Sequence, residues 1–472
     1  MPLGYSASMK DSTVYRQRRE RLARALRDAG GGVAIVPTAP QRQRNSDGDH
    51  PYRFDSHFHY LTGFAEPDSW LVLTGDGRSV LFCQAKDAER EIWDGVRLGA
   101  QDAPAALGVD EAFAVETLDD QLPALLGDQS AVWLPMEAAP DIHTRVRGWL
   151  DRVRSRARTG VACPGSIRDL TPLLGEMRLV KDETERATLR RAAAISSGAH
   201  ARAMRYCAER FRADPQAGVR EYEIEAELLH EFRRHGAQSP AYPSIVAAGA
   251  NACVLHYAAA DAELRAGELC LIDAGCELDG YASDITRTFP ANGRFSGPQR
   301  ALYDIVLAAQ EAAIAVTRPG ARKQDAHWAA VRVLAQGMLD VGLLDRAVHG
   351  NVDAVIESAA YRQFYMHGTG HWLGLDVHDV GEYLALEEAP VEQPDALGGT
   401  VVRKPSRVLR PGMVLTIEPG LYVRPAERVP EKFWHIGIRI EDDALITAEG
   451  CELISRGVPV APADIEALMR AV

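Results

Sequence analysis

The segment 269–286 reads LCLIDAGCELDGYASDIT, and its pattern predicts a β-hairpin that carries a carboxylate on each strand. The Asp-Gly dipeptide in its middle is the preferred two-residue hairpin turn. With that turn, Asp273 lies opposite Thr286, and Asp284 lies two positions along on the same face, with the backbones of the two aspartates roughly 7 to 8 Å apart. Like charges at this separation cost stability unless a cation lies between them, so the hairpin favours a divalent metal. The competing interpretation is a turn residue or an exposed charge at a strand end.

Three histidines in a glycine-rich segment form the second feature. Residues 366–379 read MHGTGHWLGLDVHD and contain His367, His371 and His378. The glycines argue against a helix, so the spacing of His367 and His371 is not that of a helical metal pair. The glycines instead let the backbone approach a ligand closely. A lone histidine would usually be a hydrogen-bonded core residue, but three histidines beside glycines favour a site.

Two glutamates at strand ends form the third feature. Glu418 ends the apolar run 414–417, where a solvated carboxylate is the competing interpretation. In the segment 437–443, the two-residue period of a strand places Arg439 and Glu441 on one face. Arg439 would keep Glu441 ionised, as a metal ligand must be, although an ordinary surface ion pair explains the same spacing.

Together these segments supply four carboxylates and one imidazole, without a thiolate. Such a donor set suits hard or borderline divalent ions, manganese first, with cobalt, iron or zinc as alternatives. Two ions about 3.5 to 4 Å apart bind a hydroxide between them and polarise a carbonyl. The sequence therefore predicts a hydrolase with two divalent metal ions.

Composition argues against several other functions. The chain has 472 residues and a net charge of −13, with no cluster of lysine and arginine alternating with aromatics, so we expect no nucleic-acid partner. No apolar run approaches the roughly 18 residues that span a bilayer, and residues 1–12 lack a secretory signal pattern, so we expect a cytoplasmic protein without a membrane partner. The seven cysteines include no C-x-x-C pair, which argues against a disulfide framework and a thiolate zinc site.

The length of the chain predicts two domains or more. A long helix is expected to follow Asp182, so we place a boundary near Met177 and expect domains at 1–176 and 177–472. The second domain is expected to be α+β with an antiparallel sheet, and its stretch 384–406, rich in Pro, Glu and Gly, predicts a long flexible loop. In the first domain, strand-like runs at 70–74, 79–83 and 131–134 are interleaved with helical patterns at 118–126 and 141–153. This alternation is typical of a small α/β domain.

These features resemble those of the metallopeptidases with the pita-bread fold, and most closely those of the aminopeptidase P (Xaa-Pro aminopeptidase) family. The resemblance implies an α/β amino-terminal domain and an α+β pita-bread catalytic domain with a curved antiparallel sheet. It also implies an enzyme that releases the first residue from peptides with proline in second position. It extends from about Tyr15 to Met469 and is most specific in the segments 272–275, 283–290, 371–381, 416–420 and 437–443.

The resemblance also implies roles for particular residues. Asp284 and Glu441 bridge the two metal ions, and Glu418 shuttles a proton as well as binding metal. In the amino-terminal domain, Asp47 and Trp93 are implied to contribute near the active site of a partner subunit in a homotetramer or homodimer. The implied metal ligands are Asp273, Asp284, His371, Glu418 and Glu441; the other implied catalytic positions are His256, His367, His378 and Arg439, with Tyr422 and Asp47 as substrate-binding residues.

Three alternatives stay open. Prolidase shares the fold and the ligands but is restricted to Xaa-Pro dipeptides. The segment 44–64 favours aminopeptidase P over prolidase. In favour of prolidase, the long loop contains Arg403, Lys404 and Arg407, which could include a group that binds a carboxylate. A creatinase-like hydrolase works without metal, and the intact ligand set argues against it. A catalytically inactive peptide-binding protein of this fold usually loses ligands, and none is missing here.

Overall fold

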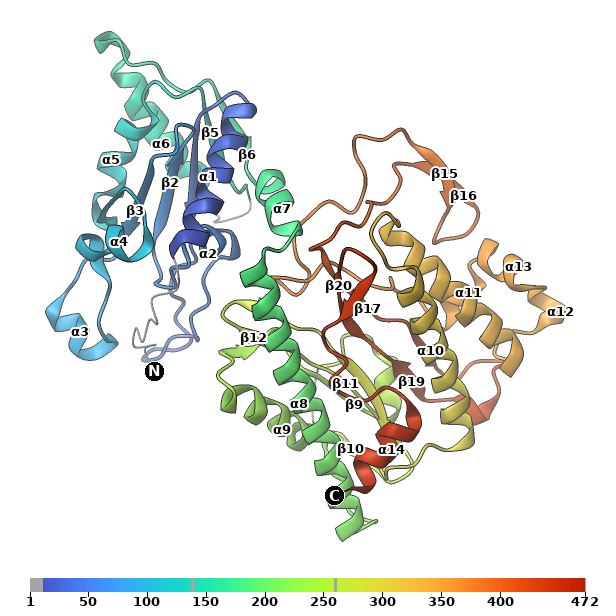
Figure 1. Ribbon diagram of the computed structural model, residues 1–472. Helices are drawn as coiled ribbons and strands as arrows, with labels where there is room; N and C mark the ends of the chain where they lie inside the picture. The colour runs from blue at the N-terminus through green and yellow to red at the C-terminus, as the bar shows by residue number, and fades with distance from the viewer. Residues whose placement is uncertain (1–11, 137–140, 259–260, 472) are drawn as a thin grey trace. The chain divides into compact units, whose positions relative to one another are not determined.

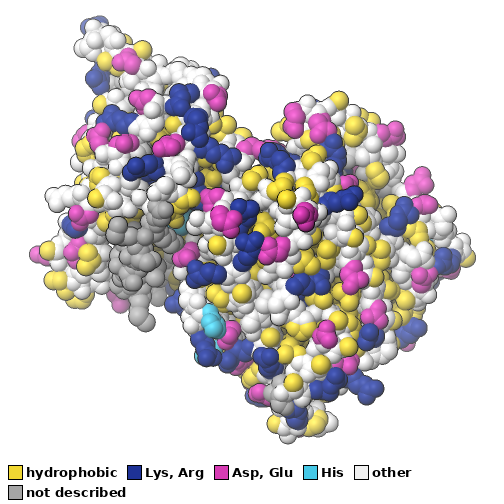
Figure 2. Space-filling view, in the orientation of Figure 1, with side chains coloured by type: hydrophobic (Ala, Val, Ile, Leu, Met, Phe, Trp, Pro, Cys, Tyr) yellow, Lys and Arg dark blue, Asp and Glu magenta, His cyan; other side chains and the backbone are white. Residues whose placement is uncertain are grey.

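The structure is a computed structural model that describes residues 12–136, 141–258 and 261–471. The chain forms two compact units, Met1–Arg178 and Leu179–Val472. Within the described ranges, no helix combines the length and the apolar character needed to cross a bilayer. On the face shown in Figure 2, acidic and basic side chains are interspersed rather than separated by sign.

A six-stranded mixed sheet forms the centre of the amino-terminal unit, in the order β4-β3-β2-β1-β5-β6 (Figure 1). One face of this sheet packs on α5 and α6, where Val33 and Ile35 meet Leu122 and Trp149 in a buried cluster. The predicted α/β alternation is therefore confirmed. The strands are β1 (Val33–Pro37), β2 (Trp70–Thr74), β3 (Ser79–Cys83), β4 (Glu111–Ala114), β5 (Ala131–Leu134) and β6 (Ser166–Asp169). The helices are α1 (Ser12–Asp28), α2 (Ser56–Thr62), α3 (Ala88–Asp94), α4 (Gly99–Leu107), α5 (Leu118–Leu126), α6 (Ile142–Ser155) and α7 (Thr171–Leu179).

The second unit, Leu179–Val472, corresponds to the domain expected to be catalytic and is called the catalytic unit. It contains antiparallel strand pairs flanked by long helices (Figure 1). Its first long helix begins where predicted, because Asp182 and Glu185 each accept a hydrogen bond from the other's backbone N–H in a capping box. The helices are α8 (Glu183–Ala213), α9 (Glu221–Arg234), α10 (Gly297–Val316), α11 (Lys323–Val341), α12 (Arg346–His349), α13 (Val352–Glu357) and α14 (Pro462–Arg470), with a short 3-10 helix, η4 (Ala360–Gln363).

Two groups of strands carry the site. The order β14-β11-β9 gives one three-stranded sheet, the order β17-β20-β21 gives another, and β18 pairs with β19. A bridge between Thr286 and Glu441 joins the first sheet to the segment between β19 and β20. The strands are β9 (Ile245–Ala248), β11 (Leu269–Asp273), β12 (Cys276–Leu278), β13 (Tyr281–Ala282), β14 (Thr286–Pro290), β17 (Val414–Ile417), β18 (Gly420–Val423), β19 (Ile436–Arg439), β20 (Asp442–Ile446) and β21 (Cys451–Leu453). Two short strands, β7 (Val219–Arg220) and β10 (Glu263–Leu264), pair with each other, and β8 (Ser239–Pro240) pairs with β12.

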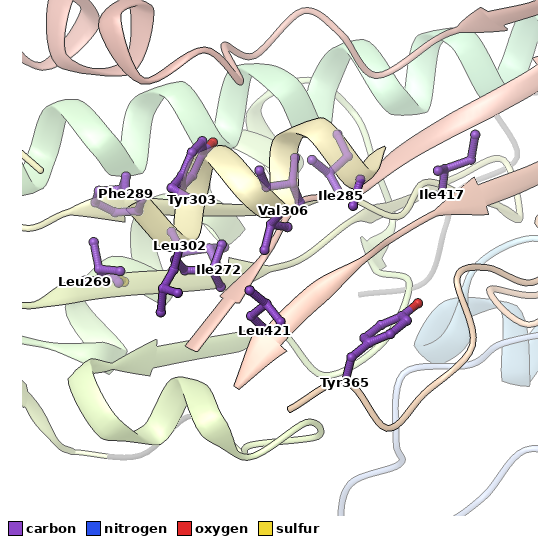
Figure 3. Close-up of a cluster of buried hydrophobic side chains, with 14 of the residues drawn as sticks. Leu269, Ile272, Ile285, Phe289, Leu302, Tyr303, Val306, Tyr365, Ile417 and Leu421 are labelled. Atoms are coloured by element: carbon purple, nitrogen blue, oxygen red, sulfur yellow. The ribbon is translucent and has the colours of Figure 1, made fainter. Parts of the chain in front are cut away.

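Helix α10 shares a buried apolar cluster with β11 and β14. Leu302 and Val306 of α10 are fully buried and belong to the same apolar cluster as Ile272 and Phe289 of the two strands (Figure 3). Burying such a side chain contributes roughly 1.5 to 3 kcal/mol. This packing fixes the position of the strand end that carries Asp273.

The predicted hairpin has the predicted register. Asp273 pairs with Thr286 across β11 and β14. The turn at Asp279 and Gly280 has positive φ at both residues, 53° and 87°, as the primed hairpin turns require. The sequence was sufficient here because register in a hairpin is set by the turn.

The hairpin is interrupted in its middle, between β13 and β14. Gly275 lies so close to the opposite strand that a Cβ there would be 1.7 Å from the carbonyl oxygen of Ser283. Asp284, which follows Ser283, belongs to no strand, and its backbone N–H lies 3.3 Å from Asp443 Oδ1. This close approach, possible only for glycine, brings Asp284 to the neighbouring β20.

The prediction of a flexible loop at 384–406 is wrong. Strands β15 (Val391–Pro394) and β16 (Thr400–Arg403) form an antiparallel hairpin in that stretch. A bridge between Leu384 and Ser406 closes its base, and the backbone N–H of Gly399 donates to the carbonyl of Glu357 at 2.8 Å. Both strands are short and largely exposed, so they lack the alternating apolar pattern by which a strand is recognised.

Candidate active site

The four carboxylates among the predicted metal ligands lie at or just beyond strand ends in the catalytic unit. Asp273 ends β11, and Asp284 lies between β13 and β14. Glu418 lies between β17 and β18, and Glu441 between β19 and β20. His371 lies in the irregular segment after η4. These positions leave the side chains outside the regular ladders, where several strands end together.

Asp284, His371 and Glu441 form the centre of the cluster. One ligand atom from each of the three lies within 4.8 Å of the other two. His371 Nε2 is 3.3 Å from Asp284 Oδ2 and 3.9 Å from Glu418 Oε1. The structure therefore brings these four predicted ligands together.

His371 presents its Nε2 atom to the carboxylates. Its Nδ1 donates a hydrogen bond to the carbonyl of Trp372 at 2.9 Å, which fixes the tautomer expected of a metal-binding histidine. Its backbone N–H donates to Thr416 Oγ1 at 3.1 Å. A Cβ at Gly370 would lie 1.9 Å from the carbonyl oxygen of Thr416. The sequence predicts that glycines of this segment approach a ligand, whereas the close approach at Gly370 is to β17.

Arg439 binds Asp273 rather than Glu441, which corrects the interpretation of the segment 437–443. Its Nη2 lies 2.6 Å from Asp273 Oδ2. Strand β19 ends at Arg439, so the two-residue period does not continue to Glu441. Glu441 Oε2 instead accepts a hydrogen bond from Thr286 Oγ1 at 2.7 Å.

Burial and mutual repulsion oppose ionisation of this cluster. Burial, followed by the charge of Asp284, raises the pKa of Glu441 well above its ordinary value. Burial raises the pKa of Glu418 to about 7, and burial with the charge of Asp273 raises the pKa of Asp284. Burial acts on Asp273 as well, but the charge of Arg439 holds the pKa of Asp273 below its ordinary value. Without a cation, several of these carboxylates would hold protons.

The donor set fits divalent cations. Carboxylate oxygens and one imidazole nitrogen are ligands that manganese, iron, cobalt and zinc accept. Burial alone would lower the pKa of His371, but its hydrogen bond to Asp284 and the charge of that carboxylate raise it to about 9. The negative field that favours a proton on His371 would equally attract a metal ion, and a bound ion would let the carboxylates ionise.

Two predicted site residues lie on one side of Glu418. His367 Nδ1 is 3.6 Å from Glu418 Oε2, and its Nε2 is 2.8 Å from the hydroxyl of Tyr422. That hydroxyl accepts a hydrogen bond from Arg439 Nη1 at 2.9 Å. Burial, followed by the charge of Arg439, lowers the pKa of His367 to about 3. His367 is therefore a neutral ring whose Nδ1 donates to the carbonyl of Gly368 at 2.7 Å and whose Nε2 accepts a hydrogen bond from the Tyr422 hydroxyl.

Of the other two predicted histidines, His378 lies beside His371. The ring centroids of His371 and His378 are 4.0 Å apart. Burial lowers the pKa of His378, with smaller contributions from the charges of His371 and His256. His256 is exposed. Asp47 belongs to the amino-terminal unit, where it is exposed and its N–H lies 3.1 Å from Asn45 Oδ1.

Tyr242 is a site residue that the sequence did not reveal. Its hydroxyl lies 2.6 Å from Asp273 Oδ1 and also contacts Asp284. It lies in the turn between β8 and β9, and nothing in the local pattern distinguishes it from a tyrosine of an ordinary turn.

Two buried ion pairs beside the site were also missed. Lys181 Nζ lies 2.9 Å from Asp379 Oδ2, and both side chains are almost fully buried. Arg287 Nη2 lies 2.8 Å from Asp442 Oδ1, again with both side chains buried. The first pair holds the segment that carries His371, and the second lies directly behind Glu441. Each joins residues far apart in the sequence, so periodicity could not predict it.

The close-packed carboxylates and His371 suit a metal-dependent hydrolase, and comparison with known proteins identifies the class. The pattern of Metallopeptidase family M24 matches residues 187–448, more than half of the chain. A second pattern, Aminopeptidase P, N-terminal domain, matches residues 15–133. The chain belongs to metallopeptidase family M24.

Individual relatives narrow this class. The Xaa-Pro aminopeptidase of Escherichia coli is 42% identical over 459 residues, which are 96% of this chain and 97% of the relative. The structure of Pseudomonas aeruginosa aminopeptidase PepP is 46% identical, covers 98% of both chains and has a TM-score of 0.88. A zinc-substituted E. coli aminopeptidase P in complex with product is 42% identical, covers 98% of this chain and 99% of the other, and also has a TM-score of 0.88. Within family M24, the chain belongs to the Xaa-Pro aminopeptidases.

Proposed function

We propose that the protein is a metal-dependent exopeptidase that releases the first residue from peptides with proline in second position. The observation that carries the proposal is the buried cluster in which Asp284, His371 and Glu441 offer ligand atoms within 4.8 Å of one another. Membership in the Xaa-Pro aminopeptidases supports the proline preference.

The proposed metal ligands are Asp273, Asp284, His371, Glu418 and Glu441, which together hold two divalent ions, with manganese preferred. When bound, the ions would supply a hydroxide nucleophile near neutral pH and polarise the peptide carbonyl. Asp284 and Glu441 are the bridging ligands in this proposal. The supporting observation is that both belong to the tightest group of ligand atoms.

The remaining residues move the proton and stabilise developing charge. Glu418 accepts the proton that the nucleophile loses and passes it to the proline nitrogen as that amine leaves. His256 or His378 donates a hydrogen bond to the oxygen that becomes negative in the transition state. Arg439 keeps Asp273 ionised through the contact at 2.6 Å, and through Tyr422 it orients His367. His367 and Tyr422 line the place for the peptide.

Proline in second position is selected by shape. Proline lacks the backbone N–H of other residues, so a site built around its ring need not provide an acceptor there. A residue with an N–H would bury an unpaired donor in the same site, which costs free energy.

We expect the manganese-loaded protein to release alanine from Ala-Pro-Leu and from longer peptides that begin Ala-Pro. Replacing the proline by alanine is expected to lower kcat/KM at least about tenfold, because the added N–H lacks a partner. Mass spectrometry of the products gives kcat/KM for the proline peptide and for its alanine counterpart. Cleavage of Ala-Pro alone would assign prolidase activity instead. Binding of Ala-Pro-Leu without any cleavage, in protein that retains its metal, would favour an inactive peptide-binding protein.

We also propose a homotetramer or homodimer in which Asp47 and Trp93 act near the site of a partner subunit. The supporting observation is an exposed apolar group at the end of α3, where Trp93 and Ile92 are 82% and 81% exposed and Val96, just after the helix, is 68% exposed. Light scattering at assay concentration is expected to give the mass of a dimer or tetramer. A monomer with full activity would contradict the proposal.

A further inference from the structure

A cavity adjoins the metal cluster inside the catalytic unit. It has a volume of about 360 Å³ and lies between the start of α11, the segment after η4 and the β15–β16 hairpin. His367 is shared by this cavity and the metal cluster, since its Nδ1 lies 3.6 Å from Glu418 Oε2. The cavity is thus next to the place where a peptide bond would be cleaved.

The cavity wall is positively charged. Lys323, Arg362 and Arg403 line it, and no aspartate or glutamate does. Within the described part of the chain, none of these three cations forms an ion pair with a carboxylate. The Nε atom of Arg403 is buried without a hydrogen-bond partner in the same described residues. Burial lowers the pKa of Lys323 to about 8, against the charge of Glu418, so Lys323 still holds its proton near pH 7. Several cations in a partly buried site cost free energy unless an anion binds there.

The cations are held in place. The amino group of Lys323 donates to the carbonyl of Gly370 and lies 4.6 Å from the ring centroid of Tyr383, so two of its three N–H groups remain for a ligand. Burial, with the charges of Lys323 and Arg362, lowers the pKa of His327 to about 4, which indicates that both charges lie near this ring. His327 is therefore neutral near pH 7.

The hairpin positions Arg403. Arg403 ends β16 opposite Val391, and its carbonyl accepts a hydrogen bond from Gln393 Nε2 at 3.2 Å. At the base of the hairpin, Arg322 Nη1 donates to the carbonyl of Ser406 at 2.6 Å. The backbone that carries Arg403 is therefore anchored on the residue that precedes α11 and within the hairpin itself.

We propose that this cavity binds a carboxylate carried by the peptide substrate and makes the enzyme selective for peptides with that charge. The inference rests on the peptidase activity proposed above. Guanidinium groups bind carboxylates through paired, charge-assisted hydrogen bonds, and Arg362 and Arg403 each offer such a group. The carboxylate could come from an acidic first residue, from an acidic residue after proline or from the carboxyl terminus of a short peptide.

Three matched peptide pairs distinguish these sources. Glu-Pro-Leu against Gln-Pro-Leu tests the first residue, Ala-Pro-Glu-Leu against Ala-Pro-Gln-Leu tests the third, and Ala-Pro-Leu against its amide tests the terminus. In one of the three pairs, kcat/KM for the peptide with the carboxylate is expected to be about tenfold higher than for its uncharged partner, which corresponds to about 1.4 kcal/mol. Replacing Arg403 by methionine is expected to bring that ratio close to one, and Arg403→Lys is expected to restore part of it.

Arg410→Met is the matched control. Arg410 is exposed and lies shortly after the same hairpin, and its replacement by methionine removes the same charge. It is expected to keep the wild-type ratio. The proposal fails if no pair shows a preference, or if a preference survives in Arg403→Met or is lost equally in Arg410→Met. Circular dichroism of each variant verifies folding, and Arg362→Met supplies a second variant with the same expected loss of selectivity. Absence of cleavage of every peptide by the wild-type protein would instead overturn the proposed function.

Discussion

Replacing Glu441 by glutamine is expected to lower kcat/KM for Ala-Pro-Leu on the order of a thousandfold. Glutamine keeps the shape of the side chain but removes the charge that two cations would share. Glu441 lies in the tightest part of the cluster, with Asp284 and His371. Loss of its charge leaves the cations poorly neutralised in a buried site, so metal content should fall as well. Steady-state kinetics and elemental analysis on one preparation measure the two effects.

Asp284→Asn is expected to behave like Glu441→Gln, because the two carboxylates occupy equivalent places in the cluster. Glu431→Gln is the matched control, since Glu431 is an exposed glutamate just before β19 and the change in charge is the same. This variant should keep wild-type activity and metal content. Retention of both metals and of full turnover by Glu441→Gln would remove Glu441 from the metal site.

Replacing Arg287 by methionine is expected to lower the free energy of unfolding by about 3 to 5 kcal/mol. The Arg287 guanidinium is fully buried and bonds to Asp442 Oδ1 at 2.8 Å and to the carbonyls of Glu441 and Pro459 at 2.6 and 3.2 Å. Methionine fills part of the volume but leaves those acceptors without a donor. Arg456 Nε still lies 2.9 Å from Asp442, so part of the charge remains compensated.

Thermal unfolding followed by circular dichroism measures this effect, and the Tm of the catalytic unit should fall by about 6 °C or more, at about 2 °C per kcal/mol. Arg300→Met is the control, because it breaks the exposed pair with Asp304 at 2.8 Å, in which both side chains are about half exposed. An exposed pair of this kind contributes at most about 1 kcal/mol. Equal shifts for the two variants would show that burial of the Arg287 pair contributes nothing.

Local features of the fold were predictable from the sequence. The hairpin register at Asp273 and the capping box at Asp182 depend on residues close together in the chain. Their outcome is decided by turn and cap chemistry, which the sequence displays directly. For the same reason the strand end that carries Glu418 could be recognised as an apolar run followed by a carboxylate.

The contacts between segments were not predictable. Arg439 was expected to serve Glu441, two residues away, but its partner is Asp273 on another strand pair, at 2.6 Å. Tyr242 reaches Asp273 from a turn without any pattern of its own. The hairpin that carries Arg403 has two short, largely exposed strands, so its sequence resembles that of a loop. Each of these features depends on contacts between segments, which the local sequence pattern does not show.

Manganese titration of the metal-free protein tests the two-metal site most directly. Metal is removed with a chelator, and release of alanine from Ala-Pro-Leu is followed as manganese is added, with bound metal measured by elemental analysis on the same samples. Activity is expected to be absent at the start and to reach its maximum at about two ions per chain. Full activity in protein that elemental analysis finds free of metal would contradict the two-metal site.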